Sequence, residues 1–235
     1  MIEIKKGKEP SELARYRNLK DATYRNLHGA PSGRVDADGR RIDVYTIVLN
    51  SLIREQGQLC AYCMKRIPER KGRISATIEH IEPQSRTDES MRLDYRNMLA
   101  VCSGNRNGAD HEKTCDARRG SLPQDRQTLY VNPLKKDTLK TIVYHSNGVI
   151  SSEDSKIDQN LNDTLNLNCR YMDLPGLRKA ALTAMQQEIH KKYPGKTAPK
   201  DYFVKLRKKI ASENMSKRPY VGILIQWLDH KIQRS

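Results

Sequence analysis

Four cysteines in the middle of the chain have a spacing that suits a zinc site. Cys60 and Cys63 are separated by two residues, and Cys102 and Cys115 follow downstream. Two thiolates on one tight turn reach the same tetrahedral ion, and two more complete its coordination. The long loop between Cys102 and Cys115 must then fold back to close the site. We expect a closed structural Zn²⁺ site of four cysteines, with His111 as the alternative to Cys115.

A second group of polar residues lies inside this cysteine frame. Glu79 and His80 are adjacent, Asn97 follows downstream, and Asp116 comes directly after the last of the four cysteines. Carboxylate oxygens suit Mg²⁺ or Mn²⁺. An imidazole titrates near neutral pH and can take a proton from water that attacks a phosphodiester. The Asn97 amide cannot act as a base, but it can bond to the backbone near His80 and fix that loop.

The order of these residues resembles the zinc-stapled branch of the HNH endonucleases. The motifs that carry the resemblance are Cys60-x2-Cys63, Glu79-His80-Ile81-Glu82-Pro83, Asn97-Met98-Leu99, Cys102 and Cys115-Asp116. It implies a ββα-metal fold, in which a β-hairpin carries the acidic-His pair, a loop carries the asparagine and a helix carries the last ligand. It also implies that His80 is the general base, Glu79 an acidic metal ligand and Asn97 the asparagine of the motif. The last metal ligand is then Asp116, with His111 as its rival.

A wider resemblance covers most of the chain. The flanking motifs are Ile4-Lys5-Lys6-Gly7, Glu9-Pro10, Leu165-Asn166-Leu167-Asn168, Leu174 and Arg178. With the HNH core over roughly residues 60–120, they are similar to the PtuB-like HNH nuclease subunit of Septu and related retron anti-phage systems. Those proteins act beside an ABC-type ATPase. The resemblance therefore implies an effector nuclease of anti-phage defence with an ATPase partner.

Short elements must position these side chains. Residues 43–56 have the i, i+3, i+4 apolar stripe of an amphipathic helix. Residues 74–81 alternate loosely and predict a strand that runs into a loop, and residues 97–102 form a second short apolar element. A short helix is expected around 115–119. The fold class that follows is α+β, a ββα-metal core stapled by the zinc site, with flanking helices and a basic C-terminal helical region.

We divide the chain into three parts. Residues 1–42 are expected to form a basic N-terminal arm with a short helix near 10–20. Residues 43–135 are the zinc-stapled nuclease domain. Residues 136–235 are a β-hairpin followed by a basic helical region that binds nucleic acid or a partner.

The third part carries most of the positive charge. A Ser146-Asn147-Gly148 turn between two apolar runs predicts the hairpin. Beyond residue 160, three sets of apolar residues at helical spacing predict three helices. From Arg170 to Ser235 there are 15 Lys and Arg against 5 Asp and Glu, a surplus of ten.

Composition indicates where the protein acts and on what. The 235 residues carry a net charge of +15, which favours nucleic acid or another polyanion as partner. We expect DNA rather than RNA, although phosphodiester hydrolysis requires the same residues for both. No apolar run is long enough to span a membrane and no secretory signal is visible, so we expect a cytoplasmic protein. Because five is an odd number, the cysteines cannot all be paired in disulfides. Cys169 is expected to be a small core residue.

Two other functions are compatible with the same residues. A non-catalytic zinc module that only binds nucleic acid or a partner would account for the cysteines and the charge, but not for Glu79, His80 and Asn97. A stand-alone restriction-type HNH nuclease would use the helical region as its own reader of DNA.

Overall fold

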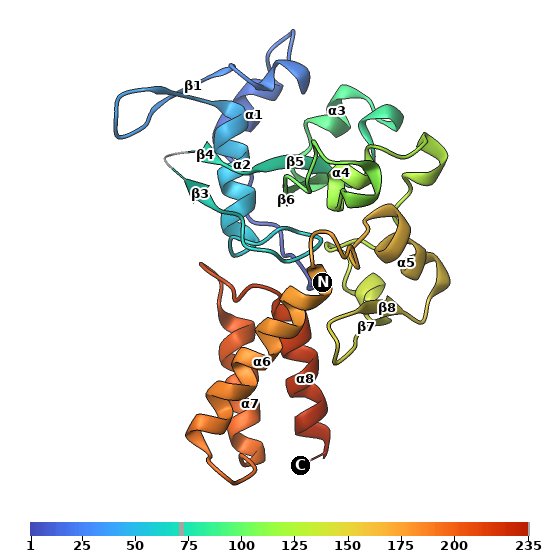
Figure 1. Ribbon diagram of the computed structural model, residues 1–235. Helices are drawn as coiled ribbons and strands as arrows, with labels where there is room; N and C mark the ends of the chain where they lie inside the picture. The colour runs from blue at the N-terminus through green and yellow to red at the C-terminus, as the bar shows by residue number, and fades with distance from the viewer. Residues whose placement is uncertain (71–72, 235) are drawn as a thin grey trace.

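Helices and small antiparallel sheets make up the molecule. The computed structural model describes residues 1–70 and 73–234. In this part of the chain each sheet has two strands. The strands β1 to β6 lie in an upper part, and three long helices form a lower part (Figure 1). This mixture confirms the expected α+β class, whereas the ββα-metal assignment stays a prediction.

The helix α2 (Val44–Glu55) is the predicted helix of residues 43–56. The Asp43 carboxylate caps it by accepting a backbone hydrogen bond of 2.8 Å from the first turn. Directly after the helix, the Gln56 amide donates to Ala100 O and accepts from Ala100 N, both at 2.8 Å. The Gln56 side chain thus bonds the backbone of β6 (Met98–Cys102) as a neighbouring strand would, and it connects the end of α2 to the sheet.

The strands β5 (Ala76–His80) and β6 (Met98–Cys102) form the antiparallel pair that carries the residues of interest. Their register places His80 opposite Met98, where the sheet ends. Every residue of β6 is buried, so its apolar run packs on both faces. The second predicted apolar element, residues 97–102, is therefore a strand.

The predicted strand over residues 74–81 is divided into two. Its first residue belongs to β4 (Arg73–Ile74), which pairs with β3 (Glu69–Arg70) rather than with β6. Ser75 separates the two pairings, and its amide bonds to Pro68 O at 3.3 Å. The strand then runs into a loop after His80, as expected.

The loop between β6 and α4 (Cys115–Arg119) folds back as the spacing requires. Thr114 N donates to Gly104 O at 2.9 Å and closes the loop at its base. Gly104 has a φ of +57°, and a Cβ there would lie 2.1 Å from Thr114 O. A glycine is thus needed at this turn. The predicted helix over residues 115–119 has the bounds of α4.

Residues 1–42 contain more structure than an extended arm. The predicted short helix is α1 (Ser11–Arg17), which packs against α2. A hairpin of β1 (Pro31–Val35) and β2 (Arg41–Asp43) follows, which the sequence did not predict. Four of the five residues of β1 are exposed and the buried one, Ser32, is polar, so the strand lacks the apolar alternation of a half-buried strand. Leu13 and Leu27 are fully buried, so this segment contributes to the main core.

Short connecting elements complete the upper part. They are α3 (Glu89–Arg92), 3-10 turns at Arg25–Leu27, Gln84–Arg86, Tyr95–Asn97, Asp110–Glu112, Gln124–Arg126 and Lys136–Leu139, and a π-helical turn at Asn160–Thr164. The predicted hairpin is β7 (Ile142–Tyr144) with β8 (Ile150–Ser152), and α5 (Ser155–Gln159) follows it.

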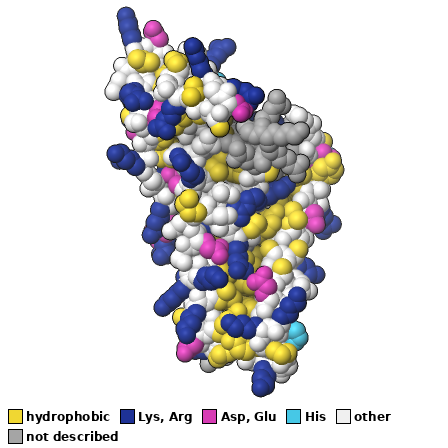
Figure 2. Space-filling model, turned by 90° about the vertical axis from the view of Figure 1, so that its left-hand side faces the viewer, with side chains coloured by type: hydrophobic (Ala, Val, Ile, Leu, Met, Phe, Trp, Pro, Cys, Tyr) yellow, Lys and Arg dark blue, Asp and Glu magenta, His cyan; other side chains and the backbone are white. Residues whose placement is uncertain are grey.

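The three predicted C-terminal helices are α6 (Leu174–Lys192), α7 (Lys200–Ser212) and α8 (Val221–Arg234). They enclose a second core with Leu182, Met185, Ile189, Phe203, Ile210, Leu224 and Leu228. Lys and Arg side chains are spread over the helical part on either side of an apolar strip (Figure 2). None of the helices that the structure describes combines the length and the apolar character needed to cross a membrane. Binding of nucleic acid or a partner by this part stays a prediction.

Candidate functional site

The four predicted thiol ligands come together in one cluster. The sulfur atoms of Cys60, Cys63, Cys102 and Cys115 all lie within 4.8 Å of one another, and the side chains are buried. Three of the Sγ–Sγ distances are 3.8, 3.8 and 3.9 Å. A Zn–S bond of about 2.3 Å implies a tetrahedron with edges of about 3.8 Å. The cluster can therefore hold a metal ion such as Zn²⁺.

Three segments of the upper part supply these thiols. Cys60 and Cys63 lie on a tight turn after α2, Cys102 ends β6, and Cys115 begins α4. Contact with the Cys102 thiol, more than burial, raises the pKa of Cys63 and of Cys115 well above the usual thiol range. Four thiolates this close need a cation to be ionised together, so the chemistry of the donors also fits a bound divalent ion.

His111 is not a ligand of this cluster. Its side chain is 81% exposed, and its ring nitrogen lies 4.0 Å from Glu112. The alternative of three cysteines and one histidine is therefore wrong. Cys169 is buried outside the cluster, with its sulfur 3.6 Å from Glu112 O, as expected for a small core residue.

Glu79 lies on β5 with its carboxylate held by two donors. Arg119 Nη1 lies 2.6 Å and the Tyr62 hydroxyl 3.2 Å from the same oxygen, Oε1. The residue is only 6% exposed. Burial first, and the Asp116 carboxylate second, raise the pKa of Glu79 to about 8, although Arg119 acts in the opposite direction. A cation next to Glu79 would stabilise its ionised carboxylate.

His80 ends β5 with its tautomer fixed by the backbone. Its Nε2 lies 2.8 Å from Arg92 O, and because a carbonyl only accepts, Nε2 carries the proton. The lone pair is then on Nδ1, which the Gln84 amide approaches at 3.2 Å. Burial lowers the pKa of His80, which favours the neutral ring. The Tyr24 ring packs edge-on at a centroid distance of 4.4 Å. His80 therefore has the form of a positioned base.

Asn97 joins the loops on both sides of the His80 ring. Its Oδ1 accepts from Glu82 N at 2.9 Å, and its Nδ2 donates to Glu82 O and to Met91 O, both at 3.3 Å. Glu82 follows the His80 strand, and Met91 precedes the carbonyl that holds His80 Nε2. These are the backbone bonds that the sequence predicts for this amide.

Asp116 is the more accessible of the two carboxylates. Its side chain is 20% exposed and pairs with Arg106 at 2.5 Å. Its charge raises the pKa of Glu79 and opposes the lowering of the pKa of His80, so Asp116 lies within electrostatic range of both groups. The largest charge effects on Glu79 come from Asp116 and Arg119 and not from His111. Asp116 is thus the better placed of the two rival ligands.

The oxygen site differs in geometry from the cysteine cluster. Within residues 1–70 and 73–234, only the four cysteines bring three or more ligand atoms within 4.8 Å. An ion between Glu79 and Asp116 would have two protein ligands and keep several waters, which is how proteins usually hold Mg²⁺. The residues present thus offer two carboxylates to Mg²⁺ or Mn²⁺, each of which is paired with an arginine in this structure.

Sequence reasoning missed four residues of this site: Tyr24, Tyr62, Arg106 and Arg119. Two of them had a signal beside the cysteines. Tyr62 lies between Cys60 and Cys63, and Arg119 lies one helical turn after Cys115. Tyr24 and Arg106 stand in segments with no recognisable motif.

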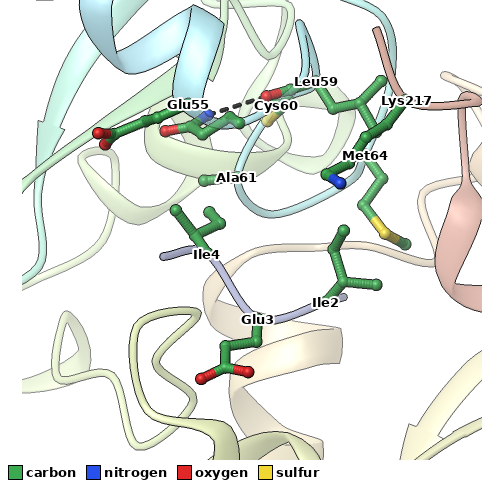
Figure 3. Close-up of a pocket in the computed structure, with 10 residues that line it drawn as sticks. Ile2, Glu3, Ile4, Glu55, Leu59, Cys60, Ala61, Met64 and Lys217 are labelled. Atoms are coloured by element: carbon green, nitrogen blue, oxygen red, sulfur yellow. Dashed lines mark hydrogen bonds between the residues drawn. The ribbon is translucent and has the colours of Figure 1, made fainter. Parts of the chain in front are cut away.

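Two cavities are lined by none of Glu79, His80 and Asp116. One of about 20 Å³ lies between Ile2, Ile4 and the segment from Leu59 to Met64 (Figure 3). It has room for a single water, so it is no substrate site. A groove of about 1110 Å³ lies between the β1–β2 hairpin and α2, lined in part by Arg34, Arg40, Arg41 and Arg54.

Comparison with known proteins adds no family to this description. No protein-family model matches the chain, and no curated protein matches it. The chemistry of the site is thus argued from its own geometry.

Proposed function

We propose that the protein is a metal-dependent HNH endonuclease that hydrolyses phosphodiester bonds of nucleic acid. One observation carries the proposal. The His80 ring is held at Nε2 by Arg92 O, its Nδ1 lone pair faces the Gln84 amide at 3.2 Å, and the Asp116 carboxylate acts on the pKa of both His80 and Glu79. A neutral base beside two carboxylates is the arrangement that hydrolysis of a phosphodiester requires.

The chain's own groups have distinct tasks in this reaction. His80 Nδ1 takes a proton from water while the new O–P bond forms and the bond from phosphorus to the 3′ oxygen breaks. Solvent supplies the proton to the leaving oxygen. Asn97 keeps the loop around the His80 ring in place through its bonds to Glu82 and Met91. Mg²⁺ or Mn²⁺ held by Glu79 and Asp116 would stabilise the charge on the phosphate and on the leaving oxygen.

The cysteine cluster has a structural task in this proposal. With Zn²⁺ bound, four thiolates leave no open coordination position, so the ion does no chemistry itself. Bound there, it would join the turn after α2, the end of β6 and the start of α4. Asp116 lies on α4, and Glu79 and His80 lie on β5, which pairs with β6.

The substrate and the biological role follow from charge and resemblance. A net charge of +15, concentrated in the C-terminal helices, supports binding of DNA through its phosphates. The resemblance to the PtuB-like family supports a role as the effector nuclease of a cytoplasmic anti-phage system that acts with an ABC-type ATPase.

A cleavage assay with a matched histidine variant tests the proposal. Zinc-loaded protein with Mg²⁺ or Mn²⁺ is offered plasmid, single-stranded DNA and tRNA, alone and with the co-expressed ATPase. His80→Ala should abolish cleavage while zinc content and fold stay intact. His190→Ala, on the exposed surface of α6, should cleave like the wild type. Cleavage retained by His80→Ala would refute the assignment.

One observation favours a non-catalytic alternative. Glu79 and Arg119 form a buried ion pair, with side chains 8% and 4% exposed, and such a pair can serve structure alone. The chain would then be a zinc module that binds nucleic acid without cutting it. The same assay separates the two functions, because that module retards DNA on a gel but never shortens it.

A further inference from the structure

Tyr62 links the cysteine turn to the candidate catalytic carboxylate. It lies between Cys60 and Cys63, its side chain is 1% exposed, and its hydroxyl donates to Glu79 Oε1 at 3.2 Å. The phenol has no other hydrogen-bond partner in the described part of the chain. A buried hydroxyl with one partner has a fixed direction. The turn that holds two thiols thus also holds one oxygen of Glu79.

Arg119 makes the second link, from the helix that begins at Cys115. Its guanidinium is buried and donates to Glu79 Oε1 at 2.6 Å. It also donates to His80 O at 2.8 Å, Ile81 O at 2.9 Å and Gln127 O at 2.8 Å. Four bonds leave this side chain a single position, and that position fixes both the Glu79 carboxylate and the backbone carbonyls of His80 and Ile81.

Both donors address the same oxygen of Glu79. With Oε1 bonded to Tyr62 and Arg119, the second oxygen, Oε2, is the one left for another partner such as a metal ion. A carboxylate held at one oxygen offers the other in a defined direction. Groups that hold a metal ligand in this way usually matter nearly as much as the ligand itself.

On the basis of the proposed function, we propose that Tyr62 and Arg119 are positioning residues that hold Glu79 for the catalytic divalent ion. The segments that carry the cysteines thereby also set the affinity of the second metal site. Cys60, Cys63 and Cys115 fix where the turn and α4 lie, and Tyr62 and Arg119 transmit that placement to Glu79. The cysteine cluster is in this way coupled to the oxygen site and does more than stabilise the fold.

The test uses Tyr62→Phe in the zinc-loaded full chain, with Mn²⁺ as the probe. Mn²⁺ binding is measured by electron paramagnetic resonance, and cleavage of plasmid is followed as a function of Mn²⁺ concentration. We expect Mn²⁺ affinity to fall about ten-fold. Cleavage at saturating Mn²⁺ should recover most of the wild-type rate, and zinc content should stay at one ion per chain.

Tyr95→Phe is the matched control. Tyr95 is as buried as Tyr62 and also donates to a carboxylate, that of Glu55 at 3.0 Å, which is not one of the candidate metal ligands. It should leave Mn²⁺ affinity unchanged. If Tyr62→Phe also leaves it unchanged, the inference is wrong. Loss of zinc by Tyr62→Phe would equally overturn it, because the residue would then serve the cysteine turn alone.

A second variant keeps the inference testable if the first misfolds. Arg119→Lys retains the charge but cannot reach Glu79 and both backbone carbonyls together, so it should also weaken Mn²⁺ binding about ten-fold or more. Unchanged affinity in Arg119→Lys would contradict the inference. A wild-type chain that neither binds Mn²⁺ nor cleaves would instead refute the proposed function itself, so the two failures are distinguishable.

Discussion

The two candidate metal sites lie side by side but are built in opposite ways. The cysteine cluster has four identical, buried ligands, with sulfur–sulfur distances near those of a zinc tetrahedron. The site at Glu79, His80 and Asp116 has mixed ligands, and Asp116 is 20% exposed. Its side chains are held by hydrogen bonds from other residues. A closed site is defined by its ligands alone, whereas an open site depends on the groups around them.

This difference separates stability from chemistry. A filled thiolate site has no position for substrate, so its contribution is to the fold. An open site can accept substrate and water, but its ligands need support because the ion itself does not complete the coordination. Variants of the two sites should therefore fail in different ways.

The largest effect is expected from the closed site. Cys60→Ser should reduce zinc content from one ion per chain to nearly none. We expect the melting temperature to fall by roughly 10 °C or more, since loss of a metal costs several kcal/mol and each is worth about 2–4 °C in a chain of this size. Cys169→Ser, at a buried thiol outside the cluster, is the control. Equal melting temperatures for Cys60→Ser and the wild type would show that the cluster does not stabilise the fold.

Substitutions at the open site should reduce cleavage without unfolding the protein. Asp116→Asn removes one negative oxygen ligand, which should lower the cleavage rate about 100-fold, equivalent to roughly 3 kcal/mol. Zinc content and melting temperature should stay as in the wild type. Asp110→Asn changes an exposed carboxylate in the same loop, paired with Lys113 at 2.8 Å, and should cleave normally. If Asp116→Asn cleaves equally well, Asp116 is no ligand of the catalytic ion.

A third variant tests the C-terminal helical part, which is expected to bind the phosphates of DNA. Lys205, Arg207, Lys208 and Lys209 lie on α7, and Arg207 already pairs with Asp229 at 2.9 Å. Replacing all four by Gln should make the slope of log K against log salt shallower by about 3 for DNA binding. Replacing Lys135 and Lys136 is the control. An unchanged slope would indicate that α7 faces a protein partner rather than DNA.

The smallest effect concerns the cap of α2, which supports both sites. Hydrogen bonds from Gly29 and Thr46 lower the pKa of Asp43, although burial opposes them. Asp43→Ala should cost about 1 kcal/mol of unfolding free energy. Because the folded pKa is depressed, this contribution is complete at neutral pH and is lost as the pH falls below the ordinary carboxyl range. Urea unfolding at pH 7 and pH 3 measures it, with exposed Asp21→Ala as control. A cost that is the same at both pH values would contradict the role of the charge.

Elements with a periodic pattern could be predicted from the sequence. The helix over residues 43–56, the hairpin around Asn147-Gly148 and the three C-terminal helices follow from apolar spacing and turn residues. The β1–β2 hairpin could not be predicted, because most of β1 is exposed and its one buried residue, Ser32, is polar, so its sequence lacks an apolar alternation. The division of the strand at Ser75 depends on a change of pairing partner, which local sequence does not encode.

The same distinction applies to the candidate site. The cysteine ligands could be predicted because thiol spacing constrains a tetrahedral ion, although only the fold excluded His111. The donors to Glu79 could not, because Tyr62 and Arg119 lie 17 and 40 residues away along the chain. Long-range partners of this kind have no fixed spacing in a single sequence.

Anomalous diffraction from crystals of the zinc-loaded protein soaked in Mn²⁺ tests the central claim of two metal sites most directly. Data collected at the zinc and manganese edges identify each ion by its position. The account predicts zinc among Cys60, Cys63, Cys102 and Cys115, and manganese between Glu79 and Asp116, close to His80. Manganese found only among the cysteines, or zinc bound at Glu79 and Asp116 with the cysteines empty, would contradict it.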